Sequence, residues 1–342
     1  MILPYRTRRF FRGLGIAALV LVMVLVVAWL IWLLWLDRYV IYTQDGVILD
    51  FNQSATIAPG QVAVPPQNDM TVSIYFNEGD NTIDISTELR QVYGYYIDAN
   101  MLEKEMSTVM SQLKKLPPQT PVLVEIKDIK GRFFFSTSLG PVRSTMDTAA
   151  VESLFDYLRN SDLYTIAKFP ALRDYNYGLN HVSNGIFHRS GMGLWMDDDR
   201  CYWLNPSSQG TQSYIIQIIT ELKLKGFDEV VLGDYTIPQS SNISYKEDRK
   251  EALAAAAKSI LEACGTDRFA VSFCVSDPSV TLPEGRVRMY MENQSAANLK
   301  TLADSSKLED TAVRLVFLTD VNDTRFDEYG VLRPLNTAHL EE

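Results

Sequence analysis

The stretch Ser213–Leu232, SYIIQIITELKLKGFDEVVL, contains one helix and one strand of a repeating pattern that decides the fold. Its first part is amphipathic at helical spacing and ends at Gly226, a residue that suits the left-handed position after a helix. Its last part, Glu229–Leu232 (EVVL), is an apolar run of strand length. The stretch therefore predicts a helix that leads directly into a buried strand.

The same alternation continues on both sides of this stretch. Six further runs have strand length: Val92–Asp98, Val122–Lys127, Tyr164–Phe169, Phe269–Val275, Val287–Met291 and Val313–Leu318. Further helical stretches are Met101–Leu113, Thr148–Leu158, Lys246–Ala263 and Ala296–Ala303. Near-continuous apolar strands separated by helices indicate parallel strands that are covered on both faces.

Seven such strands in about 230 residues compare with the eight strands of a (β/α)8 barrel, which takes about 250 residues. We therefore predict an α/β fold of the (β/α)8, or TIM, type, either complete or lacking one strand. A doubly wound open sheet is the alternative. Its dinucleotide-binding form is disfavoured because no G-x-G-x-x-G motif follows the first strand.

The N-terminal region contains an uncharged apolar run, Gly13–Leu36, preceded by Arg6, Arg8, Arg9 and Arg12. A helix of this length crosses the ~30 Å hydrocarbon core of a membrane. The excess of arginine before the run places the N-terminus in the cytoplasm and the rest of the chain outside. The alternative is a cleaved signal peptide, but the run exceeds the usual apolar region of about 7–15 residues and no A-x-A-like site follows it.

These features predict four parts of the chain. They are a basic cytoplasmic tail (1–12), a transmembrane helix (13–36), an extended connector with short strands such as Thr71–Phe76 (37–90), and the barrel domain (91–342) with a long insertion (174–206). An insertion of this length in a compact domain is usually functional or has its own structure.

Composition narrows the function classes. The net charge is −10, and most of the arginine excess lies in the tail, so the outer domain is acidic and nucleic acid is not an expected partner. The three cysteines, Cys201, Cys264 and Cys274, form no zinc-type spacing, and one bond between Cys264 and Cys274 stays open. We expect no metal and no cofactor.

Charged side chains follow several of the predicted strands. In a barrel, residues at the carboxyl ends of the strands face the site. A pair of carboxylates there is the usual apparatus of glycoside hydrolysis, although such groups also form structural ion pairs. The candidates are Asp98, Glu125, Lys127, Asp128, Lys168, Arg173 and Asp234.

The insertion is rich in aromatic residues, including Trp195 and Trp203. Aromatic rings in such a loop stack on sugar rings in some proteins and form a small core of their own in others. Both interpretations fit these two tryptophans equally well.

Four stretches, in this order, resemble a family of glycoside-hydrolase-like barrels of unknown function, many of them from Gram-positive bacteria. VLVEIKDIKG at Val122–Gly131 is similar to a strand-two pattern V-I-D-V-K-D followed by glycine, and AKFPALRD at Ala167–Asp174 to A-R-I-V-V-F-K-D. The insertion has Trp195, Asp197, Trp203 and Asn205-Pro206 in the family's order, and GFDEVVLGDYTIP at Gly226–Pro238 is similar to G-F-D-E-I-Q-F-D-Y-I-R-F-P. The resemblance covers about Val92–Val275 and implies a barrel that acts on sugars.

The chain departs from this family at the positions that matter most for hydrolysis. Without a gap, Gly233 takes the place of the strand-four aspartate and Thr236 that of its arginine, while Asp234 comes one residue late. Successive strand residues point to opposite faces, so Asp234 is expected to point away from the barrel axis unless a bulge at Gly233 redirects it. Cys274 replaces the strand-five aspartate, and Lys168 replaces the strand-three arginine.

Our first hypothesis is a membrane-anchored, extracytoplasmic barrel that acts on or binds a cell-envelope polysaccharide. In an active enzyme, Asp234 would be the nucleophile or base, and Glu125 or Asp128 the acid. The opposing hypothesis is a non-catalytic sugar-binding or scaffold module, which the displaced carboxylates favour; a solute-binding or sensor ectodomain is a third. Substrate binding is assigned to Asp98, Lys127, Lys168, Arg173, Trp195 and Trp203.

Overall fold

The computed structural model describes residues 40–43, 46–49 and 89–337, together with positions 23, 25, 26 and 29. The chain divides into two compact units, Met1–Asn81 and Thr82–Glu342. The predicted tail, most of the predicted membrane span and connector, and the predicted strand Thr71–Phe76 lie outside the described residues. Among the described residues, no helix is long and apolar enough to cross a membrane.

The first unit contains one described hairpin. Strand β1 (Val40–Thr43) pairs antiparallel with β2 (Gly46–Leu49), and Thr43 lies opposite Gly46.

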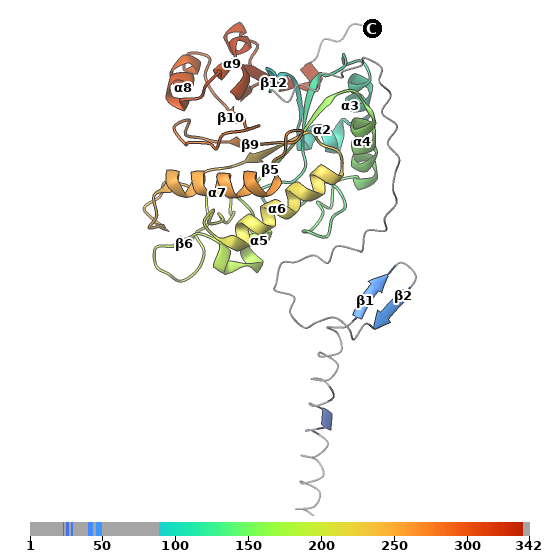
Figure 1. The fold of residues 1–342 in the computed structure, drawn as a ribbon, viewed down its shortest axis with the longest axis vertical. Helices are drawn as coiled ribbons and strands as arrows, with labels where there is room; N and C mark the ends of the chain where they lie inside the picture. The colour runs from blue at the N-terminus through green and yellow to red at the C-terminus, as the bar shows by residue number, and fades with distance from the viewer. Residues whose placement is uncertain are drawn as a thin grey trace, which may run out of the picture. The chain divides into compact units, whose positions relative to one another are not determined.

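The second unit is built on a closed barrel of eight parallel strands (Figure 1). Each strand pairs with the next along the chain, and the last pairs with the first. The strands are β3 (Tyr93–Ile97), β4 (Pro121–Glu125), β5 (Tyr164–Pro170), β7 (Glu229–Gly233), β9 (Ala270–Cys274), β10 (Met289–Glu292), β11 (Leu315–Leu318) and β12 (Gly330–Pro334). The predicted parallel barrel is confirmed.

One of these strands was not predicted from the sequence. Strand β12 has the sequence GVLRP, in which a glycine, an arginine and a proline interrupt the apolar pattern. It nevertheless pairs with β11 on one side and with β3 on the other, and so closes the barrel. The barrel is therefore complete.

Helices follow or precede the strands on the outside of the barrel. They are α2 (Ala99–Lys104), α3 (Met106–Leu113), α4 (Thr148–Asn160), α5 (Tyr175–Asn180), α6 (Gln209–Leu224), α7 (Arg249–Cys264), α8 (Leu299–Ser306) and α9 (Thr311–Arg314). Asp98, Asp147, Asp174 and Asp248 each cap the helix that follows by accepting backbone N–H bonds. The predicted helix Met101–Leu113 is two helices that meet at Glu105.

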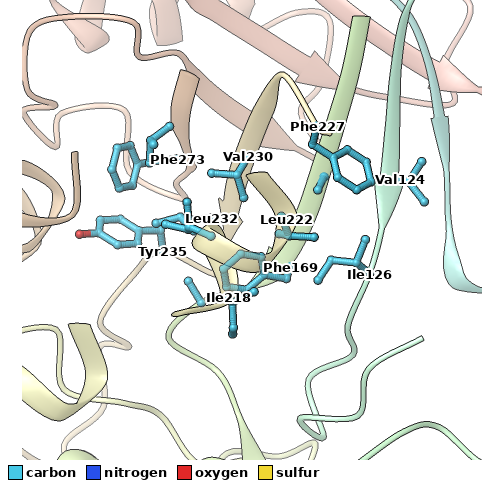
Figure 2. Close-up of a cluster of buried hydrophobic side chains, with 14 of the residues drawn as sticks. Val124, Ile126, Phe169, Ile218, Leu222, Phe227, Val230, Leu232, Tyr235 and Phe273 are labelled. Carbon is cyan, nitrogen blue, oxygen red and sulfur yellow. The ribbon is translucent and has the colours of Figure 1, made fainter. Parts of the chain in front are cut away.

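The main core lies between the strands and the surrounding helices. Ile218 and Leu222 of α6 belong to the same cluster of buried side chains as Phe169 of β5 and Leu232 of β7 (Figure 2). Helices α6 and α7 pack against each other beside this cluster. Continuous apolar strands are required here because their outer faces are covered by helices.

A second, smaller core fills the inside of the barrel. Leu123, Ile166, Val231, Val316 and Leu332 form its middle, one residue from each of five strands. Since side chains alternate along a strand, residues two positions further along these strands also face the barrel axis. This alternation decides which polar groups reach the site.

A buried ion pair lies at the amino end of the barrel interior. The Arg288 guanidinium contacts the Glu229 carboxylate, and both side chains are almost fully buried. Glu229 also accepts hydrogen bonds from Tyr164 at 2.9 Å, Ser272 at 2.5 Å and Tyr290 at 3.0 Å. A buried charge is tolerated only when it is paired and hydrogen-bonded, and this one satisfies both conditions.

The insertion at 174–206 has its own structure. It contains α5, a 3₁₀ helix (Val182–Asn184) and strand β6 (Phe187–His188), which pairs antiparallel with β8 (Ile243–Ser244). Tyr175 stacks on Tyr202, and Tyr177 stacks on Tyr214 of α6. Much of the aromatic content of the insertion therefore forms its own core and attaches it to the barrel wall.

Candidate functional site

Lys168 is the central charged group at the carboxyl end of the barrel. It lies two residues after Ile166 on β5, so its side chain follows the inward-facing row. Its ammonium group contacts Glu125 of β4 at 3.2 Å and also contacts Glu292 of β10. Burial opposes the charge on Lys168, but the two carboxylates outweigh it and raise the pKa of the lysine. Lys168 is therefore a permanent cation held between two acids from different strands.

Gly233 occupies the inward-facing position at the end of β7. It lies two residues after the core residue Val231, and a Cβ added there would be 3.5 Å from Cε of Lys168. Any longer side chain at this position would point toward Lys168. Gly233 stands where the family that the sequence resembles has its strand-four aspartate. This position faces the barrel axis, but here it has no side chain.

Asp234 follows with a left-handed backbone, φ 46°. Aspartate adopts this conformation more readily than most residues. Burial raises the pKa of the Asp234 carboxyl, an effect that Arg173 and Lys168 partly oppose. No described residue donates a hydrogen bond to this carboxylate. From the sequence, the Asp234 side chain was expected to point away from the barrel axis unless a bulge redirected it. Instead, the left-handed backbone of Asp234 itself brings the carboxylate within electrostatic range of Arg173 and Lys168.

Cys274, at the end of β9, belongs to the inner core of the barrel. Burial raises the pKa of its thiol, and Glu292 raises it further. The thiol is thus protonated at neutral pH and cannot act as a carboxylate would. All three cysteines are free, so the bond considered between Cys264 and Cys274 does not form.

Arg173 connects the rim to the insertion. It contacts Asp197 at 2.6 Å and Asp199 at 2.5 Å, and its guanidinium lies over the Trp203 ring. Although burial opposes it, hydrogen bonds from the Cys201 N–H, the Trp203 indole and Arg173 lower the pKa of Asp197. This cluster holds the Arg173 side chain within electrostatic range of Asp234.

Lys127 lies on the outer side of the barrel wall. Its ammonium group donates to Asp174 at 2.6 Å, and neither side chain is exposed. Asp174 also accepts from the Tyr214 hydroxyl and from the backbone N–H of Tyr177. Because this pair is inaccessible to solvent, Lys127 is placed to hold the insertion to the barrel and not to meet a ligand.

Two further predicted acids serve the local backbone. Asp98 accepts from the N–H of Met101 at the start of α2. Asp128 accepts from the N–H groups of Lys130 and Arg132 and forms an ion pair with the Arg132 side chain at 2.7 Å. Both lie at the carboxyl ends of their strands, as predicted, but Asp128 is occupied by the turn that it stabilises.

The two predicted tryptophans differ in environment. Trp203 is buried, and its indole N–H donates to Asp197 at 2.9 Å. Trp195 is half-buried and packs against the edge of the main core. Trp195 is thus the more accessible of the two.

The sequence did not single out Glu292 or Tyr96, although both face this end of the barrel. Glu292 directly follows the predicted strand Val287–Met291. The expectation that charged residues at the carboxyl ends of strands face the site, which selected Glu125, would therefore have selected Glu292 as well. Tyr96 has a pKa raised to about 12, mainly by burial and further by Asp320 and Asp98. A tyrosine inside an apolar run gives no signal that it faces a polar rim.

A cavity of about 360 Å³ opens at the carboxyl end of the barrel, beyond β7 and β9. Trp203, Thr236, Arg249, Asp277 and further residues line it. A larger cavity of about 740 Å³ lies at the opposite end, where Phe269, Arg286 and Arg314 precede their strands. The smaller cavity lies at the same end of the barrel as the candidate site. No group of three or more His, Cys, Asp or Glu residues in the described part of the chain is placed to hold a metal ion.

Comparison with known families identifies the family of the chain. Residues 94–267, half of the chain, match a family model described as "Putative glycosyl hydrolase domain". The chain belongs to this glycosyl hydrolase-like family. The match confirms the resemblance drawn from the four sequence stretches and includes the first four strands of the barrel. A search of curated proteins finds no match.

Solved structures with the same type of barrel share little sequence with the chain. A hypothetical protein from Ruminiclostridium thermocellum is 17% identical with a TM-score of 0.46, over 53% of this chain and 96% of that one. An α-galactosidase from Lactobacillus brevis is 11% identical with a TM-score of 0.46, over 74% and 36%. The galactosidase domain of an α-galactosidase–sucrose kinase is 10% identical with a TM-score of 0.50, over 74% and 38%. The chain thus spans less than half the length of these two galactosidase chains.

Proposed function

We propose that this member of the family binds carbohydrate at the carboxyl end of its barrel and hydrolyses it slowly or not at all. The observation that carries this proposal is the contact of Lys168 with both Glu125 and Glu292. Hydrolysis of a glycosidic bond needs one carboxyl group to donate a proton and a second, about 5–10 Å away, to act as nucleophile or base. A carboxylate that is ion-paired with a buried lysine is a poor proton donor.

The remaining acids do not restore such a pair. Gly233 carries no carboxylate at the inward position of β7, and Cys274 carries a thiol at that of β9. Asp128 is bonded to its own turn. The charged rim, with Arg173 and the half-exposed Trp195, still offers hydrogen-bond donors and an aromatic surface of the kind that sugars use.

A second candidate function, slow hydrolysis through Asp234, is favoured by one observation. The Asp234 carboxyl is half-buried, receives no hydrogen bond from any described residue, and has a raised pKa. A group of this kind suits a general acid or base. Glu125 or Glu292 would have to leave Lys168 to complete the pair.

One experiment separates these two functions. The full-length protein, purified in detergent, is incubated with cell-envelope polysaccharide, and both retention of the glycan and release of reducing ends are measured. We expect retention with little or no release. Robust release that disappears in Asp234→Asn, with an unchanged melting temperature, would refute the binding-only proposal and establish the enzyme.

We further propose that residues 13–36 anchor the protein in the cell membrane, with its main domain outside and its ligand a polysaccharide of the envelope. The uncharged length of this run and the arginines before it support the proposal. Protease added to intact protoplasts is expected to remove everything after about residue 40. Protection of the bulk of the chain would overturn this topology.

A further inference from the structure

We propose that the cavity beyond β7 and β9 is a subsite for a negatively charged sugar unit, one that carries a carboxylate or a phosphate. The inference rests on the proposed carbohydrate binding and narrows its ligand class. The cavity, about 360 Å³, is of the size of small-molecule sites, whose usual range begins near 300 Å³.

The walls of the cavity come from segments that the barrel fold brings together. Thr236 and Pro238 follow β7, Ser276 follows β9, and Trp203 comes from the insertion. Thr236 lies two residues after Asp234, and Trp203 bonds the carboxylate that holds Arg173. Trp203 thus lines the cavity and also contacts Arg173 of the candidate site, so the cavity is placed to hold a neighbouring sugar unit.

Charge in this cavity is positive although the chain as a whole carries −10. Its charged lining residues are Arg249, Lys250 and Asp277. Lys250 is already occupied, since its ammonium group contacts Asp277 at 3.1 Å and Ser279 at 2.5 Å. One positive charge, that of Arg249, remains uncompensated within the cavity.

The Arg249 guanidinium has no hydrogen-bond or ion-pair partner among the described residues, and its Nε atom is buried without an acceptor. Polar groups in protein interiors are nearly always paired, so the Arg249 guanidinium, which lines the cavity without a partner in the described part of the chain, is available to an acceptor from outside the chain. The planar guanidinium binds carboxylate and phosphate oxygens in two-point contacts. The backbone N–H groups at the start of α7 do not compete for this ligand, because Asp248 already accepts from Lys250 and Glu251.

Trp203 contributes the apolar wall. One side of its ring packs under Arg173, and the residue also lines the cavity. An aromatic wall beside a charged donor suits a ring that has an apolar face and an anionic substituent.

The test uses full-length protein in detergent and three probes of equal length: an oligogalacturonate, a glycerol phosphate oligomer and a neutral galactose oligosaccharide. Binding is measured by calorimetry. We expect one or both anionic probes to bind more tightly than the neutral one. The Arg249→Gln variant should lower affinity for that anionic probe by about tenfold or more, and leave neutral binding unchanged, because a charged hydrogen bond is lost. Lys250→Gln should have a smaller effect, since Lys250 is already paired.

The matched control is Arg189→Gln, an exposed arginine of the insertion that does not line the cavity. It should leave all affinities unchanged, and equal melting temperatures should show that every variant folds. If the neutral probe binds as tightly as the anionic ones, or Arg249→Gln has no effect, the charged subsite is refuted while the proposed sugar binding stands. If none of the probes binds and no envelope polysaccharide is retained, both proposals fail.

Discussion

The ammonium group of Lys168 lies 3.2 Å from the carboxylate of Glu125 on the neighbouring strand, at the place where a glycoside hydrolase would hold its reacting groups. Lys168 of β5 also contacts Glu292 of β10, so its ion pairs connect three strands of the barrel, β4, β5 and β10. Both acids at this rim are thus paired with the same largely buried cation.

Replacing this lysine should destabilise the protein. Lys168→Met leaves Glu125 and Glu292 facing each other without a cation, at a site where both are only partly exposed. We expect a loss of about 1–3 kcal/mol in the free energy of unfolding, measured by urea denaturation. The matched control is Lys258→Met, which removes an exposed ion pair with Glu262 at 3.9 Å and should cost less than about 1 kcal/mol. Equal losses in the two variants would show that Lys168 is not held as described.

Asp234 should make the protein less stable as the pH rises. Its pKa is raised in the folded state, so between the ordinary aspartate pKa and the raised one the folded protein binds more protons than the unfolded chain. Stability contributed by this group is therefore lost as the pH increases through that window. Asp234→Asn should be more stable than the parent at pH 7, and the difference should vanish as the pH falls; asparagine tolerates the left-handed backbone. Thermal unfolding over a pH series measures both.

Asp277 serves as a control, because its effect on stability should change with pH in the opposite direction to that of Asp234. Hydrogen bonds from Ser279 and the charge of Lys250 lower its pKa. The stability that it contributes is present above the ordinary aspartate pKa and is lost as the pH falls through the lowered value. Asp277→Asn should therefore be less stable than the parent at pH 7. If both variants shift in the same direction, the assignment for Asp234 is contradicted.

The buried pair of Arg288 and Glu229 should behave as a unit. Arg288→Met leaves an unpaired carboxylate inside the barrel and should cost about 3–5 kcal/mol. Arg288→Met combined with Glu229→Leu removes both charges and should cost less than the single change. Urea denaturation of the single and double variants decides the matter, and additive losses would mean that the two side chains are not coupled.

Trp195 and Trp203 should respond differently to truncation. Trp203 is buried and bonded to Asp197, so Trp203→Ala should cost about 3–5 kcal/mol in stability. Trp195→Ala should weaken retention of envelope polysaccharide more than it weakens folding, because this ring is half-exposed at the insertion. A large drop in melting temperature with unchanged retention would make Trp195 a structural residue.

Much of the barrel could be predicted from the sequence because its strands are covered on both faces. Runs such as Val313–Leu318 and Val122–Lys127 are mostly apolar, which is the pattern of strands that are covered both inside and outside the barrel. Strand β12 was not predicted because Arg333, whose side chain is largely buried and pairs with Asp327, and Pro334 interrupt its apolar pattern. A strand whose polar residue has a tertiary partner carries no local signal of its burial.

The site was less predictable than the fold. Alternation along β7 places Gly233 in the inward row, but the left-handed backbone that brings Asp234 near the rim cations gave no signal in the sequence. The ion-pair partners of Lys127 and Lys168 could not be predicted from the sequence, because both lysines lie at the ends of predicted strands. One pairs with Asp174 outside the barrel wall and the other with two acids inside it. The ion-pair partner of each lysine depends on which side of the barrel wall its side chain faces.

The seam between β12 and β3 has a consequence for how the protein is made. Val331 pairs with Tyr93, so the last strand to leave the ribosome must dock against the first. Until then the barrel is an open sheet with two unpaired edges, and such edges are prone to join other chains. If residues 13–36 direct the chain across a membrane as proposed, β3 reaches the far side before β12, and we expect the two edges to stay unpaired there until β12 arrives.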